Sequence, residues 1–229
     1  MELRDAILNR KSIRGFKDTP VSKETLAEVL NLAARAISAL NGQPWKFVVL
    51  TGDVKDKIGQ MNVEDFMNEA EEDIKDPEII GEGRRRRIGI AKQLFTAMEI
   101  PRGDDEKRMW WTQRGFRFFD APAVVLIAID KEFDKTFHRL DIGAFMQNFT
   151  LAAMEYGLGT CVELQALNYQ RGLKEYLGLD MEDEFVIGIA VGYPDEDFPA
   201  NSVVTERDDI DSLTQWFGFK EEKRIKGTL

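Results

Sequence analysis

Two segments of this chain, 122–129 and 185–192, are apolar at almost every position. A β-strand that is apolar on both faces must be covered on both faces, because neither side can be left against water. The stretches around these segments contain helical patterns that can supply the cover. The sequence therefore predicts an α+β fold in which helices surround a mixed β-sheet. No repeat or Gly/Ser-rich linker divides the 229 residues, so we expect one domain.

The strongest helix is expected at about 138–156, where apolar side chains recur with helical spacing and Gly157 can end the helix in the left-handed conformation. Ser22 can cap a second helix, whose apolar positions continue as far as Ile37. A short helix over 2–10 carries an apolar stripe. Other helices are expected at about 54–74, 84–98, 104–118 and 170–177, and other strands at about 46–51 and 159–164.

The formal net charge is −10, from 31 basic and 41 acidic residues, and such a surface repels nucleic acid. No stretch is apolar enough to span a bilayer, and the first residues lack a secretory signal. The single cysteine, Cys161, excludes an internal disulfide. We therefore expect a cytoplasmic protein that binds neither nucleic acid nor membrane. With one histidine and one cysteine, no metal site is expected, and His138 is interpreted as a cap or surface residue.

Three cations and a hydroxyl lie within five residues at Arg10-Lys11-Ser12-Ile13-Arg14. Planar guanidinium groups can hold the oxygens of a phosphate in pairs, and a serine adds a neutral donor. The alternative is a solvated basic turn at the end of the first helix, where cations favour the helix dipole. A second basic run, 84–87, is interpreted as the solvated start of a helix, because consecutive residues point in different directions around it.

A polar turn, 38–45, follows about thirty residues later and leads into an apolar strand. Ser38 and Asn41 can donate hydrogen bonds, and the amide of Gln43 can pair with an imide-like edge because it both donates and accepts. Ordinary turn chemistry, with Trp45 in the core, is the alternative. Together the two segments indicate a phosphorylated cofactor with a planar, hydrogen-bonding ring.

The ordered pair Arg-Lys-Ser-x-Arg and Ser-x-x-Asn-x-Gln-Pro-Trp-x-Phe resembles the flavin-binding half of the nitroreductase family. The resemblance extends over about 1–219, and the branch it suggests is that of nitrobenzoate-type reductases. Its further motifs are Phe118-Phe119-Asp120-Ala121-Pro122, Asp141-Ile142-Gly143, Gly157-Leu158-Gly159-Thr160, Gly192-Tyr193-Pro194 and Glu206-Arg207.

This resemblance implies a single FMN-binding domain over 1–229 that forms an intertwined homodimer. Residues 62–118 would be a variable insert that covers the substrate, and 201–229 a C-terminal extension. The helix at 138–156 and the aromatic end that includes Trp216, Phe217 and Phe219 would supply much of the interface.

The resemblance also implies roles for individual residues. Arg10, Ser12 and Arg207 would hold the FMN phosphate with help from Lys11, and Arg14 would lie near the pyrimidine edge and stabilise the reduced ring. Two further sets are implied: Ser38, Leu40, Asn41 and Gln43 would reach the cofactor from the neighbouring subunit, and backbone groups of Val162, Glu163 and Leu164 would face the ring. Two positions depart from the family pattern: Ile37 stands where many members have proline, and Thr205 where some carry a cation.

The function expected from the resemblance is an FMN-dependent oxidoreductase that takes hydride from NADH or NADPH. A ping-pong cycle would pass it to a small electron-poor acceptor such as a nitroaromatic or a quinone. No side chain need serve as a proton donor. The alternatives left open are reductive dehalogenation or enone reduction on the same fold, a non-catalytic flavin or phospholigand carrier, and a structural domain without a cofactor.

Overall fold

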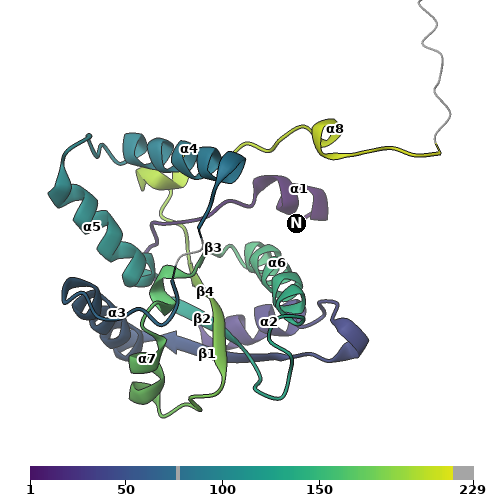
Figure 1. Cartoon of the computed structure of the whole chain (residues 1–229), viewed down its shortest axis with the longest axis horizontal. Coiled ribbons are helices and arrows are strands. Elements are labelled where there is room, and N and C mark those ends of the chain that lie inside the picture. The colour runs from purple at the N-terminus through teal and green to yellow at the C-terminus, as the bar shows by residue number, and fades with distance from the viewer. Residues whose placement is uncertain (76–77, 219–229) are drawn as a thin grey trace, which may run out of the picture.

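The computed structural model describes residues 1–75 and 78–218, and it is built around a four-stranded β-sheet (Figure 1). Each strand is antiparallel to its neighbours. In spatial order the strands are β1 (Trp45–Thr51), β2 (Ala123–Ile129), β4 (Glu184–Gly192) and β3 (Gly159–Glu163).

The expectation of a mixed sheet is therefore wrong. Strands that are apolar on both faces are common in parallel sheets, but an antiparallel pair needs the same apolar pattern when helices cover both of its faces. Here β2 and β4 are central and antiparallel, and β3 forms one edge. The parallel contact that the described residues do show is an isolated bridge to Thr160 of β3 from Ser12, which lies outside the four strands.

Helices cover both faces of the sheet (Figure 1). On one face, α2 (Lys23–Ala33) and α6 (Arg139–Glu155) pack in a single core. On the other face lie α3 (Gly52–Met67) and α7 (Gln170–Leu177), with α5 (Asp105–Phe116) against α3. All seven residues of β2 are buried, and their side chains alternate between the two cores, as the period of a strand requires.

Several local predictions are confirmed. Ser22 caps α2, because its Oγ accepts a hydrogen bond from the backbone N–H of Thr25 at 3.1 Å. Gly157 follows α6 with a φ of 70°, the left-handed conformation that glycine adopts without steric cost. The stripe of α6 is buried in the core of its own chain, with Phe145 and Phe149 fully enclosed.

The helix predicted over 54–74 is too long, since α3 ends at Met67. The chain turns there to meet the start of α7. The backbone N–H of Asp73 donates to the carbonyl of Asn168 at 2.7 Å, and its carboxylate accepts from the backbone N–H of Arg171 at 2.8 Å. These contacts need the extended segment, and Glu69 and Asp73 would repel each other at i and i+4 in a continued helix.

Apolar surfaces remain exposed near both ends of the described part of the chain. One is on α1 (Leu3–Asn9), whose Leu3, Ile7 and Leu8 form the predicted stripe but contact solvent. The other is the C-terminal segment with α8 (Ile210–Leu213), which runs away from the body of the molecule in Figure 1 and exposes Trp216 and Phe217. Phe219, the last predicted member of that cluster, lies outside the described residues. No helix within the described ranges is both long and apolar enough to cross a membrane.

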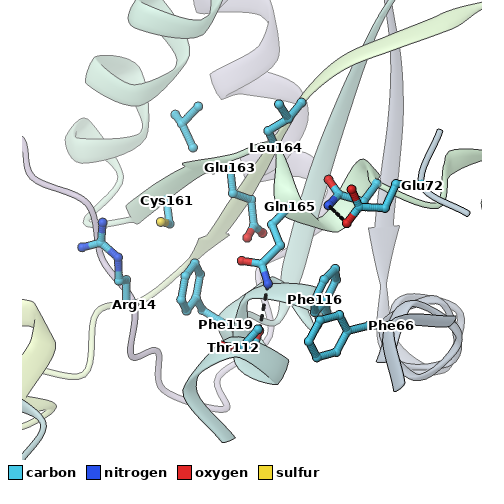
Figure 2. Close-up of a pocket in the computed structure, with 12 residues that line it drawn as sticks. Arg14, Phe66, Glu72, Thr112, Phe116, Phe119, Cys161, Glu163, Leu164 and Gln165 are labelled. Atoms are coloured by element: carbon cyan, nitrogen blue, oxygen red, sulfur yellow. Dashed lines mark hydrogen bonds between the residues drawn. The ribbon is translucent and has the colours of Figure 1, made fainter. Parts of the chain in front are cut away.

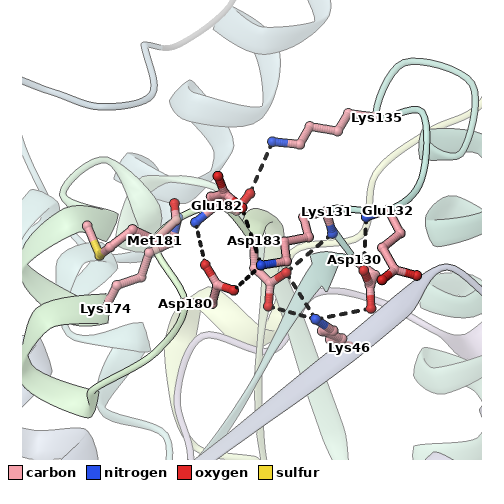
Figure 3. Close-up of polar contacts among 10 residues, drawn as sticks. All are labelled: Lys46, Asp130, Lys131, Glu132, Lys135, Lys174, Asp180, Met181, Glu182 and Asp183. Atoms are coloured by element: carbon pink, nitrogen blue, oxygen red, sulfur yellow. Dashed lines mark hydrogen bonds and ion pairs between the residues drawn. The ribbon is translucent and has the colours of Figure 1, made fainter.

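A group of ion pairs joins the ends of three strands (Figure 3). The Lys46 ammonium of β1 lies 3.0 Å from the Asp130 carboxylate, which follows β2, and 3.1 Å from Asp183, which precedes β4. Lys131 pairs with Asp180 at 2.8 Å. Solvent screens exposed pairs of this kind and they contribute little to stability, so the network fixes the loop arrangement more than it stabilises the fold.

Candidate functional site

The predicted phosphate-binding segment lies along the exposed edge of β3. The backbone N–H of Ile13 donates to the carbonyl of Thr160 at 2.9 Å, and Ser12 forms its isolated bridge with the same residue. Lys17 continues the contact by donating to the carbonyl of Tyr193 at 2.9 Å. The segment therefore occupies the free edge of the sheet, which holds its cations beside β3.

Gly159 permits this close approach. A Cβ atom at that position would lie 2.5 Å from Cγ1 of Ile13 and 2.9 Å from Cγ of Pro194. Both distances are far below van der Waals contact, so any side chain would push the segment away from the strand. The interpretation of Gly159 as a close-packing residue is confirmed.

We expect Gly159→Ala to weaken cofactor binding by about tenfold or more, because a 1 Å displacement of binding groups has effects of that order. Isothermal titration with FMN measures it. Gly172→Ala on α7 is the matched control, since its new Cβ would meet only ordinary contacts, the nearest at 3.8 Å from Met61. Unchanged affinity in Gly159→Ala would show that the position of the segment does not matter to the cofactor.

A cavity of about 510 Å³ opens beside the C-terminal half of β3 (Figure 2). We call it the β3 cavity. It brings together four of the predicted site residues, Arg14, Val162, Glu163 and Leu164. The remaining lining residues are Phe66, Glu72, Thr112, Phe116, Phe119, Cys161, Gln165 and Asn168.

The backbone of Arg14 is held from two sides. Its N–H donates to Oδ1 of Asn201 at 2.7 Å, and its carbonyl accepts from the guanidinium of Arg114 at 3.0 Å. The Arg14 guanidinium itself lies 5.9 Å from the centre of the Phe119 ring and, among the described residues, forms no ion pair. The fold thus presents an uncompensated cation to the cavity.

Arg114 is a buried support for this arrangement. Its guanidinium stacks 4.6 Å from the centre of the Phe198 ring and also donates to the carbonyl of Phe119 at 3.1 Å. Burial lowers the pKa of Arg114, and the nearby Asp120 carboxylate at 3.5 Å raises it by less. The side chain therefore ties the segment after α5 to the cation-bearing segment.

The turn that delivers the Phe119 ring is strained. Phe118, Phe119 and Asp120 have φ values of 57°, 52° and 57°, in the left-handed region that costs non-glycine residues about 1–3 kcal/mol each. The motif is visible in the sequence, but its conformation could not be predicted, because positive φ at phenylalanine has no signal in the residue types. The aromatic wall from α3 and α5, formed by Phe66 and Phe116, was not predicted either.

A second cavity, of about 500 Å³, lies at the other end of β3 and is lined by Arg10 and Lys11. Thr160 lines this cavity, whereas the residues that follow it in β3 line the β3 cavity. The two spaces are therefore successive along one strand. Asp195 and Glu196 also border the second cavity, so its cations are partly offset.

Arg207 lies elsewhere. It lines a third cavity, of about 770 Å³, between α4 (Gly81–Ala97) and the C-terminal segment. Its guanidinium donates to the carbonyl groups of Thr205 and Glu206, at 3.2 and 2.9 Å. That Arg207 and Arg10 bind the same phosphate remains a prediction.

The basic run 84–87 does more than meet solvent, since Arg85 pairs with Glu82 at 2.7 Å and Arg86 pairs with Asp208. The second of these pairs joins α4 to the C-terminal segment.

The turn with Ser38, Leu40, Asn41 and Gln43 lines none of these cavities within the chain. Its last three predicted residues have positive φ values, 51°, 60° and 50°, and Leu40 is fully exposed. Ser38 stabilises the turn by accepting from the Gln43 N–H at 3.2 Å.

The turn is anchored to α6 through Asp141. Oδ1 of Asp141 accepts from the Ala39 N–H at 3.2 Å, and Oδ2 contacts Nδ1 of His138 at 2.7 Å. His138 precedes α6 as predicted, but its side chain makes no cap bond and is mostly buried between Phe133 and Phe137. The interpretation of His138 as a cap residue is therefore confirmed, although its backbone carbonyl and not its ring makes the cap bonds, accepting from the N–H groups of Asp141 and Ile142 at 3.1 and 3.2 Å.

Residues 7–193 match the model of the Nitroreductase family. The chain is 31% identical over 218 residues to a 4-nitrobenzoate reductase of Pseudomonas putida, covering 94% of this chain and 96% of that protein. It is 32% identical over 216 residues to a nitrobenzene nitroreductase of Ectopseudomonas oleovorans, covering 92% and 94%.

Among solved structures, an FMN and NADPH-dependent nitroreductase NfnB from sphigopyxis sp. strain HMH superimposes with a TM-score of 0.87. It is 28% identical, with 96% of this chain and all of that chain covered. The fold and these matches define the chain as an oxidoreductase. It belongs to the nitroreductase family, as the resemblance in its sequence predicted.

Proposed function

We propose that this protein is an FMN-dependent oxidoreductase that reduces small nitroaromatic or similarly electron-poor acceptors. The observation that carries the proposal is the Arg14 guanidinium, which forms no ion pair with the described residues and faces an aromatic cavity next to a second, cationic cavity on the same strand. A cationic cavity at one end of β3 that can take a phosphate and an aromatic cavity at the other end that can take a ring would together suit a mononucleotide. The printed names of the relatives support the acceptor class and the cofactor.

The β3 cavity fits a polar planar ring in its chemistry. Both carboxyl oxygens of Glu163 and Oδ1 of Asn168 are buried without hydrogen-bond partners within the described residues. Buried polar atoms in native proteins are nearly always paired, so these atoms suit a ligand with hydrogen-bonding edges. The rings of Phe116 and Phe119 supply apolar contact for such a ligand.

The proposal gives each of the site residues a role toward the cofactor. Arg10, Lys11 and Ser12 would hold the phosphate, with Arg207 joining them if the C-terminal segment rearranges on binding or in the dimer. The Arg14 cation would favour the negative charge that the ring gains on reduction. Backbone groups of Val162, Glu163 and Leu164 would border the ring. FMN, when bound, supplies the hydride chemistry, taking hydride from NADH or NADPH and giving it to the acceptor in a ping-pong cycle.

A homodimer with shared sites accounts for the turn that carries Leu40. Left-handed residues and a fully exposed leucine are costly in an isolated chain but are expected where a partner subunit covers them. The stripe of α1 and the C-terminal segment offer further apolar surface, whereas the stripe of α6 is used within its own core. Under this proposal 62–118 covers the acceptor, and 201–229 extends over the partner.

Subunit complementation tests the shared site. Arg10→Ala and Gln43→Ala should each bind FMN weakly as homodimers, because each damages both sites. A dimer with one subunit of each kind has both changes in one site and an intact second site. Random co-assembly should therefore restore about a quarter of the wild-type activity. Arg10→Ala mixed with Arg14→Ala is the control, since both residues belong to the same side and no site is restored. Equal recovery in the two mixtures would contradict the shared site.

A further inference from the structure

Glu163 is a buried acid whose side chain points into the β3 cavity (Figure 2). The residue is 8% exposed, and neither carboxyl oxygen has a hydrogen-bond partner within the described part of the chain. The amide of Gln165 lies in the same cavity, but its Nε2 already donates to the carbonyl of Thr112 at 3.0 Å. An ionised carboxylate here would therefore lack the donors that a buried charge needs.

The other groups that face Glu163 do not compensate a negative charge. Burial raises the pKa of the Cys161 thiol to about 12, so the thiol is neutral. Glu72 is a second acid, and it accepts from Nδ2 of Asn168 at 3.1 Å. On the neighbouring strand β4, the residue opposite is Gly188. The linings from α3, α5 and the turn before β2 are phenylalanine and threonine side chains, which do not ionise.

Arg14 is the cation that acts on Glu163, and it does so without an ion pair between them in the described structure. Burial raises the pKa of the Glu163 carboxyl well above its usual range, and the charge of Arg14 lowers it by less. The geometry agrees, because the backbone of Arg14 is held by Asn201 and Arg114 and its guanidinium is not drawn to the acid.

We propose that Glu163 carries a proton at neutral pH, so that Arg14 keeps its full positive charge toward the cavity. An ionised Glu163 would offset that charge, since both groups face one low-dielectric space. The consequence for flavin chemistry rests on the proposed function. There, a protonated Glu163 favours reduction of the ring because Arg14 keeps its full charge, and loss of the proton at high pH removes this effect. Glu163 thus controls how strongly the Arg14 charge stabilises the reduced ring, and this control depends on pH.

Protonation itself is tested on the protein without cofactor. Infrared spectra of the wild type near neutral pH should show a protonated carboxyl band that is absent from Glu163→Gln and that disappears only as the pH is raised further. The folded wild type holds a proton that the unfolded chain releases above its ordinary pKa. Its ratio of folded to unfolded protein should therefore fall, relative to Glu163→Gln, by up to tenfold per pH unit as the pH rises above about 5.

Glu175→Gln makes the same chemical change on the exposed face of α7 and should show neither effect. Absence of the band together with parallel stability curves would overturn the proposal. If Glu163→Gln does not fold, the pH titration of the band in the wild type decides alone.

The effect of Glu163 on the flavin is tested on the FMN-loaded protein. Near neutral pH, Glu163→Gln should change the flavin midpoint potential far less than it does at high pH, because it replaces one neutral group by another. Once the pH is high enough for the infrared band to disappear, the variant should have the higher potential, since only the wild type gains a negative charge. A potential raised to the same extent at neutral pH would show an ionised Glu163. A protein that shows the infrared band but binds no FMN would refute the proposed function and leave the protonation of Glu163 standing.

Discussion

Replacing Asn201 by alanine is expected to lower the free energy of unfolding by about 3–5 kcal/mol, since each buried group left unpaired costs roughly 1–3 kcal/mol. The Asn201 side chain is 4% exposed and makes four hydrogen bonds. It accepts from the N–H groups of Arg14 and Gly15 at 2.7 and 3.2 Å, and donates to the carbonyls of Gly15 and Asp195 at 2.8 Å each. Alanine leaves all four backbone groups without these partners.

Thermal unfolding of the protein without cofactor measures the loss, which corresponds to a fall in Tm of about 10 °C for a chain of this length. Ser202→Ala is the control at the next position. It removes one exposed hydrogen bond to the carbonyl of Pro199 and should change stability by about 0.5 kcal/mol or less. A comparably small loss in Asn201→Ala would mean that the segment after α1 is held by other contacts.

The second large effect is expected from Arg14→Gln in the FMN-loaded protein. At an effective dielectric constant of about 20, the loss of a unit charge that acts on the reduced ring costs on the order of 2 kcal/mol. For a two-electron couple this corresponds to a midpoint potential lower by about 40 mV. Flavin reduction by NADH or NADPH should slow by about tenfold or more, as stopped-flow absorbance would show. Stability should change little, because Asn201 and Arg114 bind the backbone of Arg14 and not its side chain.

Arg14→Lys keeps the charge and should restore most of the potential. Arg35→Gln removes the same charge from an exposed position at the end of α2 and should leave the potential unchanged, since solvent and salt screen it. If Arg14→Gln and Arg35→Gln have the same potential, the cation does not act on the ring.

The central strands show how much of the fold could be predicted. The segment 122–129 is apolar enough to require burial on both faces, and it is β2, with every residue buried. Its direction relative to β4 could not be predicted, because pairing depends on contacts between residues about sixty positions apart, for which composition gives no signal. Both directions satisfy the same apolar pattern. The end of α3 was misjudged for a similar reason, since the groups that bind Asp73 come from the start of α7.

For the site too, local motifs could be predicted from the sequence and long-range contacts could not. The cluster of cations from Arg10 to Arg14 was visible because residue types in a short segment imply their chemistry. The groups that position it were not: Asn201 and Arg114 are far away in sequence and belong to no local motif. The conformation of Phe119 was also hidden, because its positive φ is imposed by packing. The position of Arg207 could not be predicted from local motifs either, because in the proposed dimer it depends on contacts with the partner subunit.

The hydrogen bond between Arg14 and Asn201 joins positions separated by 187 residues. During translation, the cationic segment is therefore made well before its partner, which is added 187 residues later. Until residue 201 has left the ribosome, the nascent chain has cations but no rigid frame for them, so it should not capture a cofactor tightly. Cofactor loading in the cell should then follow the synthesis of residue 201, and a truncated product that ends before residue 201 should contain no cofactor.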